Sequence, residues 1–124
     1  MLSVFTLLIL FQFKHFICDY PLQTPYMLGK LSKDNWIVPL AAHAAVHAFG
    51  TFVIAFIFST VYLAIALSIA DFVLHFIVDR IKASPSIGGR FSINNKYFWW
   101  CLGADQMAHH LINYAFIAVI LYYL

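Results

Sequence analysis

The chain has 124 residues, of which 64% are hydrophobic and 10% are charged, and its formal net charge is +2. Soluble globular domains are about half apolar and about a quarter charged. This composition, with a mean hydropathy of +0.87, excludes a soluble globular protein and indicates one integral membrane domain over residues 1–124. The seven lysine and arginine residues are scattered among apolar segments, which argues against nucleic acid as a partner.

Four apolar segments approach or reach the length of about 20 residues that a helix needs to cross a membrane. We expect membrane-spanning helices over residues 2–19, 39–58, 61–80 and 97–123. The first should end at Tyr20-Pro21, because proline disfavours helix in the residue before it. Only Ser59-Thr60 separates the second span from the third, and a break is required there because one helix of about forty residues would exceed the bilayer thickness. The predicted fold is all-α, a four-helix transmembrane bundle with up-down-up-down topology.

The basic residues predict the orientation of this bundle. All of them lie in or beside the first and third connections, namely Lys14, Lys30, Lys33, Arg80, Lys82, Arg90 and Lys96. Both connections lie at one end of an up-down-up-down bundle, and the positive-inside rule assigns that end to the cytoplasm. Both termini are then expected on the non-cytoplasmic side.

Nine histidine and aspartate residues recur at four-residue spacing within or at the ends of the apolar segments. They are His15 and Asp19, His43 and His47, Asp71, His75 and Asp79, and Asp105 and His109. Residues four apart share one helix face, and ionisable side chains at membrane depth normally face the bundle interior and have a function. At ~1.5 Å per residue, most of them fall in shared layers starting roughly 6–12 Å below the cytoplasmic ends. We therefore expect one polar cavity open to the cytoplasm.

Imidazole and carboxylate groups together favour a divalent transition-metal ion, with zinc preferred and manganese or iron as alternatives. A closed mononuclear site needs four ligands, so the larger set favours two ions. The predicted ligands are His15, Asp19, His43, His47, His75, Asp79, Asp105 and His109. Asp71, a predicted catalytic residue, is expected either to bridge the ions or to orient His75. A proton-relay or hydrogen-bond network without metal is the alternative.

Other polar residues are expected to assist this centre. Lys82 continues the face of Asp79, and lysine is a common partner of phosphate. We therefore predict that Lys82, the second predicted catalytic residue, and Arg90 bind an anionic substrate. Residues 84–90 have the composition of a flexible surface segment that would cover the cavity. Four further polar side chains are expected to support ligands, to pack or to join helices, namely Thr51, Gln106, His110 and Asn113.

The polar motifs occur in a specific order along the chain. They are His15-x-x-x-Asp19-Tyr20-x-x-Gln23-Thr24, Lys30, His43-x-x-x-His47, His75-x-x-x-Asp79-x-x-Lys82 and Asp105-Gln106-x-x-His109. This order resembles a family of small bacterial and bacteriophage membrane proteins known only as a domain of unknown function, over nearly the whole chain. The resemblance implies a four-helix membrane protein of bacterial or bacteriophage origin, which we expect in a bacterial inner membrane. It also implies that Gln23 and Thr24 lie at the rim of the site or contact the substrate. More loosely, the chain is similar to membrane-bound metal-dependent hydrolases.

The leading hypothesis is a dinuclear metal-dependent hydrolase that acts on a lipid or lipid-linked substrate, with a phosphate ester preferred, at the cytoplasmic face. Two metal ions can activate water and stabilise both oxygens of a displacement. The alternatives are a di-iron oxidase of acyl chains and a non-enzymatic metal-ion binding or transport protein. A transport site should lie near the midplane with access from both sides, whereas the outer halves of these spans contain no acidic or basic residue. A homo-oligomer would be needed to supply the missing half.

Overall fold

A computed structural model describes residues 2–32, 34–84 and 88–124, and this part of the chain is all-helical. The four long helices are α1 (Leu2–Asp19), α2 (Ile37–Phe58), α3 (Val61–Ala83) and α4 (Lys96–Tyr122). Two short 3-10 helices, η1 (Met27–Leu31) and η2 (Gly88–Arg90), lie in the first and third connections. The predicted all-α fold with four helices is thereby confirmed. Lys33 and residues 85–87, which include much of the predicted covering segment, lie outside the described residues.

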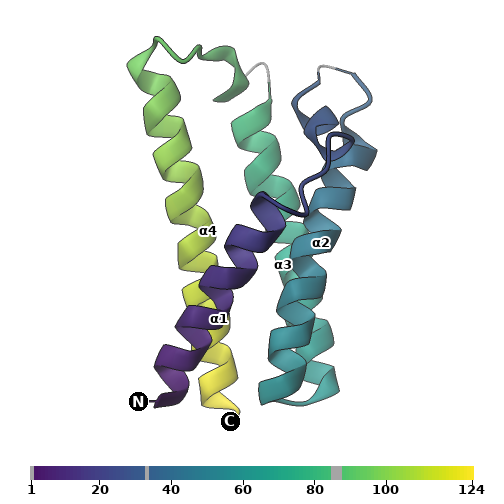
Figure 1. Cartoon of the computed structure of the whole chain (residues 1–124), viewed down its shortest axis with the longest axis vertical. Coiled ribbons are helices and arrows are strands. Elements are labelled where there is room, and N and C mark those ends of the chain that lie inside the picture. Colours follow the sequence, from purple (N-terminus) through teal and green to yellow (C-terminus); the bar gives the residue numbers. More distant parts are fainter. Residues whose placement is uncertain (1, 33, 85–87) are drawn as a thin grey trace.

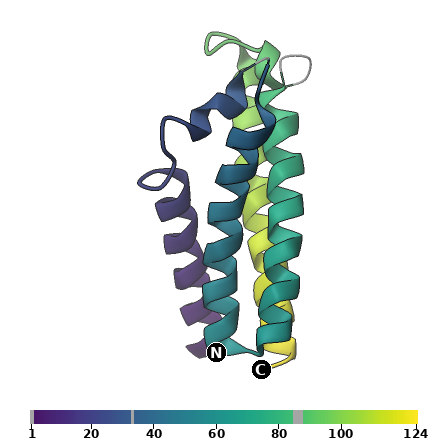
Figure 2. The ribbon, with the colours of Figure 1, turned by 90° about the vertical axis from the view of Figure 1, so that its right-hand side faces the viewer.

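Successive helices run in opposite directions, so both termini lie at one end of the molecule and the first and third connections lie at the other (Figures 1 and 2). Contacts join α1 to α2 and α4, and α3 to α2 and α4. The four helices therefore surround one interior. The η1 segment packs against α2 and reaches α3, which brings the first connection over the end of this interior.

Local hydrogen bonds set the ends of the helices. The predicted break at Ser59-Thr60 is present, and the Thr60 side chain accepts a hydrogen bond of 3.2 Å from the backbone N–H of Leu63. Threonine at this position satisfies one of the free N–H groups of the first helical turn. Asn95 caps α4 in the same way by accepting from the N–H of Tyr97 at 2.9 Å. These caps fix where α3 and α4 begin and hence the register of the residues that follow.

Three helical segments are long and apolar enough to cross a membrane, namely α1, α2 and the segment that begins at Val61. The fourth, α4, has 27 residues, and its polar residues at positions 105, 106, 109 and 110 lower its hydropathy. Large apolar side chains are exposed on the outer surface of the bundle, among them Phe13, Phe56 and Ile69. In a bundle with an apolar exterior of this kind, lipid is the solvent that matches the surface.

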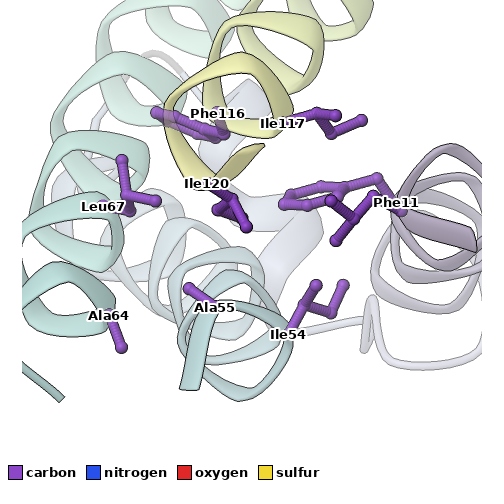
Figure 3. Packing of buried hydrophobic residues seen from close by; sticks show 9 residues of the cluster. Phe11, Ile54, Ala55, Ala64, Leu67, Phe116, Ile117 and Ile120 are labelled. Carbon is purple, nitrogen blue, oxygen red and sulfur yellow. The ribbon is translucent and has the colours of Figure 1, made fainter. Parts of the chain in front are cut away.

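The interior is divided into an apolar half and a polar half. The apolar half, at the end that holds the termini, is a cluster contributed by all four helices, and Figure 3 shows most of its side chains packed against one another: Leu7, Phe11, Ile54, Ala55, Ala64, Leu67, Phe116, Ile117 and Ile120. Phe11 and Ile120 are 1% and 0% exposed. The polar half follows along each helix toward the first and third connections.

Candidate metal centre

The polar half of the interior brings together histidines and aspartates from all four helices. Eight of the nine residues that share the four-residue spacing are buried and Asp19 is half-buried; the nine are His15, Asp19, His43, His47, Asp71, His75, Asp79, Asp105 and His109. The structure thus brings the residues of this set together in one part of the interior. The spacing of four places each pair on one face of its helix, and the contacts between helices turn those faces toward one another.

The first group of donor atoms belongs to Asp19, His43, His47 and His75, and these atoms lie within 4.8 Å of one another. Asp19 Oδ1 is 2.7 Å from His47 Nε2 and 3.4 Å from His43 Nε2. The other oxygen, Oδ2, is 3.1 Å from His15 Nε2. Three imidazoles from two helices therefore surround one carboxylate.

The second group belongs to His75, Asp79 and His109, again within 4.8 Å. His109 Nε2 lies 3.0 Å from Asp79 Oδ1 and 3.1 Å from Asp105 Oδ1. Asp79 Oδ2 lies 3.4 Å from His43 Nε2 in the first group. One carboxylate thus contacts histidines of both groups.

The imidazole rings form a continuous stack through the two groups. The ring of His75 lies between those of His47 and His109, with centroid separations of 3.8 Å and 4.1 Å. Buried ring nitrogens without a hydrogen-bond partner in the described structure are Nδ1 of His15, His43, His47 and His109 and Nε2 of His75. Buried polar atoms normally have partners. The nitrogens that lie beside carboxylate oxygens in His15, His43, His47 and His109 are the Nε2 atoms, and imidazole nitrogens grouped with carboxylate oxygens are a donor set that suits a transition-metal ion.

Asp71 lies behind His75 rather than between the two groups. Its Oδ1 is 3.4 Å from His75 Nδ1, and its Oδ2 accepts hydrogen bonds from Lys14 Nζ at 3.0 Å and from Thr51 Oγ1 at 2.5 Å. Both oxygens are therefore occupied by the chain itself. Of the two roles expected for Asp71, this geometry matches the orientation of His75 and not the bridging of two ions.

Two lysines that were not among the predicted site residues, Lys14 and Lys30, contact aspartates of the site. Lys14 is 6% exposed and contacts Asp71, and Lys30 Nζ lies 3.0 Å from Asp79 Oδ2. A signal for Lys14 was available, since it lies inside an apolar segment directly before His15. For Lys30 the only signal was its place in the order of motifs.

The predicted substrate-binding residues lie in different surroundings. Lys82 Nζ is 3.4 Å from Asp105 Oδ2, and both residues line a pocket of about 280 Å³ between α3 and α4. Gln23 Nε2 donates to the backbone oxygen of Asp19 at 2.8 Å, which ties the end of α1. Arg90 is exposed, with its guanidinium 4.8 Å from the centroid of the Phe91 ring. Among the described contacts, none joins Arg90 to the histidines and aspartates.

The supporting polar residues act between helices. Gln106 Oε1 lies 3.0 Å from His15 Nε2, and its Nε2 donates to Asp105 Oδ2 at 3.0 Å, so it joins α1 to α4. The hydrogen bond of Thr51 to Asp71 joins α2 to α3. The ring of His110 lies 5.1 Å from that of His15, and Asn113 is buried one turn beyond His109.

Comparison with known proteins identifies the family but no activity. Residues 4–124 match the model of the family described as "Protein of unknown function (DUF3307)". Neither a curated protein nor a solved structure matches the chain. The matched region includes every histidine and aspartate of the candidate centre, and the predicted membership of an uncharacterised family is confirmed. The chain belongs to the DUF3307 family.

Proposed function

We propose that this chain is a membrane-embedded metal-dependent hydrolase with a dinuclear centre, acting on a lipid or lipid-linked phosphate ester at the cytoplasmic face of a bacterial inner membrane. One observation carries the proposal: two adjacent groups of imidazole and carboxylate donors share His75, and the carboxylate of Asp79 contacts histidines of both. A structural metal site would need only four ligands. The additional donors are accounted for by two ions that keep positions open for substrate.

The contacts suggest how the donors would be divided between two ions. Asp19, His43 and His47 would hold the first ion, with His15 supporting Asp19. His75, Asp105 and His109 would hold the second. His75 has one nitrogen directed at Asp71 and only Nε2 free, so it would serve a single ion. Asp79, with one oxygen toward each group, would bridge.

The charge of the centre favours an anionic substrate. Four aspartates, at positions 19, 71, 79 and 105, face three lysines, at positions 14, 30 and 82, which leaves a formal charge of −1 with neutral histidines. Two divalent ions would change this to +3. Excess positive charge in a low-dielectric cleft attracts anions strongly. The phosphate group of a phosphate ester is such an anion.

The pocket between α3 and α4 would give a substrate access to the centre. The pocket of about 280 Å³ that contains Lys82 and Asp105 is otherwise lined mainly by apolar side chains, including Val78, Ile81 and Ala108. This combination suits an amphiphile, because the apolar wall would contact an acyl chain while Lys82 would hold the head group. When bound, paired metal ions would supply an activated water and stabilise the reacting oxygens, and Lys82 would orient the phosphate.

The apolar half of the interior favours an enzyme over a transport protein. An ion pathway needs polar access from both sides of the membrane. Here the interior beyond the histidines is filled by the cluster that includes Phe11, Phe116 and Ile120, each at most 5% exposed. The connections end of the bundle also carries Arg90 and Lys96, in keeping with a cytoplasmic location by the positive-inside rule.

Metal analysis of the detergent-purified full chain tests the proposal. We expect about two zinc or manganese ions per chain, and release of phosphate from a phosphatidic acid substrate in mixed micelles. His43→Ala and Asp105→Ala should lose both metal and activity. The control variant Lys96→Met, at an exposed position, should retain both. Iron with oxygen-dependent turnover would favour the acyl-chain oxidase instead. A chain that binds no metal, or a fully active His43→Ala variant, would refute the proposal.

A further inference from the structure

We infer that Lys14 is a positioning residue of the centre, which holds Asp71 so that Asp71 in turn holds the imidazole of His75 with Nε2 facing the other donors. This inference rests on the proposed metal centre and adds a chain of contacts that lies outside the ligand set. It also changes the interpretation of Lys14, which the sequence pattern assigns to membrane orientation.

The contacts form a continuous path across three helices. Lys14 Nζ on α1 donates to Asp71 Oδ2 on α3 at 3.0 Å, and Thr51 on α2 donates to the same oxygen. The opposite oxygen, Oδ1, lies 3.4 Å from His75 Nδ1. His75 Nε2 is buried and has no partner in the described structure. The path therefore ends at a nitrogen of His75, the residue that the two groups of donors have in common.

Gly50 makes this path sterically feasible. A Cβ atom at position 50 would lie 2.8 Å from Lys14 Cγ and 3.3 Å from Lys14 Cε. The first distance is shorter than real Cβ contacts. The lysine side chain thus passes over α2 where that helix has no side chain, and it reaches a carboxylate on α3. Any larger residue at position 50 would displace it.

Burial distinguishes Lys14 from a lysine that serves orientation. Orienting lysines extend their ammonium groups to the membrane surface, whereas the side chains of Lys14 and Asp71 are 4% and 1% exposed. A buried ion pair is weak evidence for stability, because an apolar pair of similar volume is often as stable or more so. The pair is better explained by what Asp71 does to His75.

The physical effect of this path is on the ligand geometry. A carboxylate that hydrogen-bonds the far nitrogen of a metal-binding histidine fixes its tautomer and its ring orientation. Loss of such a partner typically weakens metal binding by about 10–100-fold. Lys14 and Thr51 would fix the carboxylate itself, so their loss should reach the metal through Asp71 and His75.

Cobalt and zinc binding to the full chain in detergent test the inference. Lys14→Met, Thr51→Val and Gly50→Ala should each weaken metal affinity, by about 10–100-fold for Lys14→Met, and change the visible absorption bands of bound Co²⁺. Lys96→Met, an exposed lysine on α4, is the control and should match the wild type. In Lys14→Ala, added ethylammonium should restore affinity, because the residue borders a groove of about 580 Å³ between α1 and α2.

The outcomes separate the inference from the proposed function. A wild-type chain that binds no metal ends both. A wild-type chain that binds metal, with Lys14→Met matching it in affinity and cobalt spectrum, overturns the inference alone. If Lys14→Met fails to fold because Asp71 is left buried and unpaired, Gly50→Ala decides, since it keeps both charges and displaces the Lys14 side chain. Weaker binding with an altered spectrum supports the inference, and wild-type binding overturns it.

Discussion

Asp79 and His43 come from different helices, and their closest side-chain atoms, Oδ2 and Nε2, lie 3.4 Å apart. Through this contact the carboxylate on α3 reaches the histidines of α2, while its other oxygen contacts His109 on α4 at 3.0 Å. The two groups of donor atoms are therefore one continuous centre. Predictions about metal binding depend most strongly on this carboxylate.

Replacing Asp79 by asparagine should remove the bridge between the two groups. The amide retains its volume and one acceptor but loses the negative charge, so we expect metal content to fall from about two ions per chain to one or none. Activity should fall by at least about 100-fold. Elemental analysis and phosphate release measure the two effects. Asp34→Asn, at an exposed position in the first connection, is the matched control, and two ions retained in Asp79→Asn would contradict the bridge.

Replacing Lys30 by methionine should have the opposite effect to replacing Lys14. Lys30 contacts the oxygen of Asp79 that also faces His43, so its ammonium competes with a metal ion for that oxygen. Removing it should raise zinc affinity by about tenfold, or ~1.4 kcal/mol, and lower the stability of the metal-free chain. Competition with a zinc-sensitive dye measures the affinity. Equal or weaker zinc binding in Lys30→Met would show that the lysine does not compete.

Replacing Lys82 by glutamine should affect the substrate rather than the metal. Its side chain is 37% exposed and contacts Asp105 at the edge of the α3–α4 pocket. We expect KM for an anionic lipid to rise by about tenfold, with unchanged metal content, because a charge-assisted contact to phosphate is lost. Lys96→Gln controls for loss of surface charge. A loss of metal with unchanged KM would place Lys82 among the groups that support the ligands.

Replacing Phe11 by alanine should destabilise the bundle through its apolar half. The side chain is 1% exposed in the cluster of Figure 3, and a cavity left there loses packing contacts worth about 3–5 kcal/mol in soluble proteins. The exposed Phe13 on the same helix, 62% exposed, is the control, since Phe13→Ala should change stability little. Thermal denaturation in detergent measures both. Equal loss in the two variants would contradict the packing shown by the structure.

The proposed orientation places the first connection in the cytoplasm and the C-terminus outside. In a chain whose native cysteines, Cys18 and Cys101, are replaced by alanine, Asp34→Cys and Tyr123→Cys supply exposed probes at opposite ends. A membrane-impermeant maleimide should label position 34 only in inverted vesicles and position 123 only in right-side-out cells, as the positive-inside rule requires. The reverse pattern would move the centre to the other face of the membrane.

The helices were predictable from the sequence because their limits depend on local chemistry. The short break at Ser59-Thr60 is one example, since threonine both ends the apolar run and caps the next helix by accepting from Leu63. The faces that carry the histidines were predictable too, because four-residue spacing aligns side chains on a helix whatever surrounds it. The burial of His43, His75 and their neighbours follows from that alignment once four such faces meet.

The partners of the long side chains were not predictable in this way. In the sequence, Lys14 and Lys30 look like any other lysine near a membrane surface. In the structure, each of them contacts an aspartate on α3. The choice depends on distances between helices and on the gap at Gly50. A one-dimensional pattern contains neither quantity.

The sequence by itself determined an all-helical, apolar chain with its ionisable residues in matching layers, because helical period and hydrophobicity act within each segment. Tertiary structure alone decided that Asp79 touches both histidine groups and that Asp71 is held from behind by Lys14 and Thr51. The physical reason is that hydrogen bonds and ion pairs form over about 3 Å. Only the packing of separate helices brings atoms within that range.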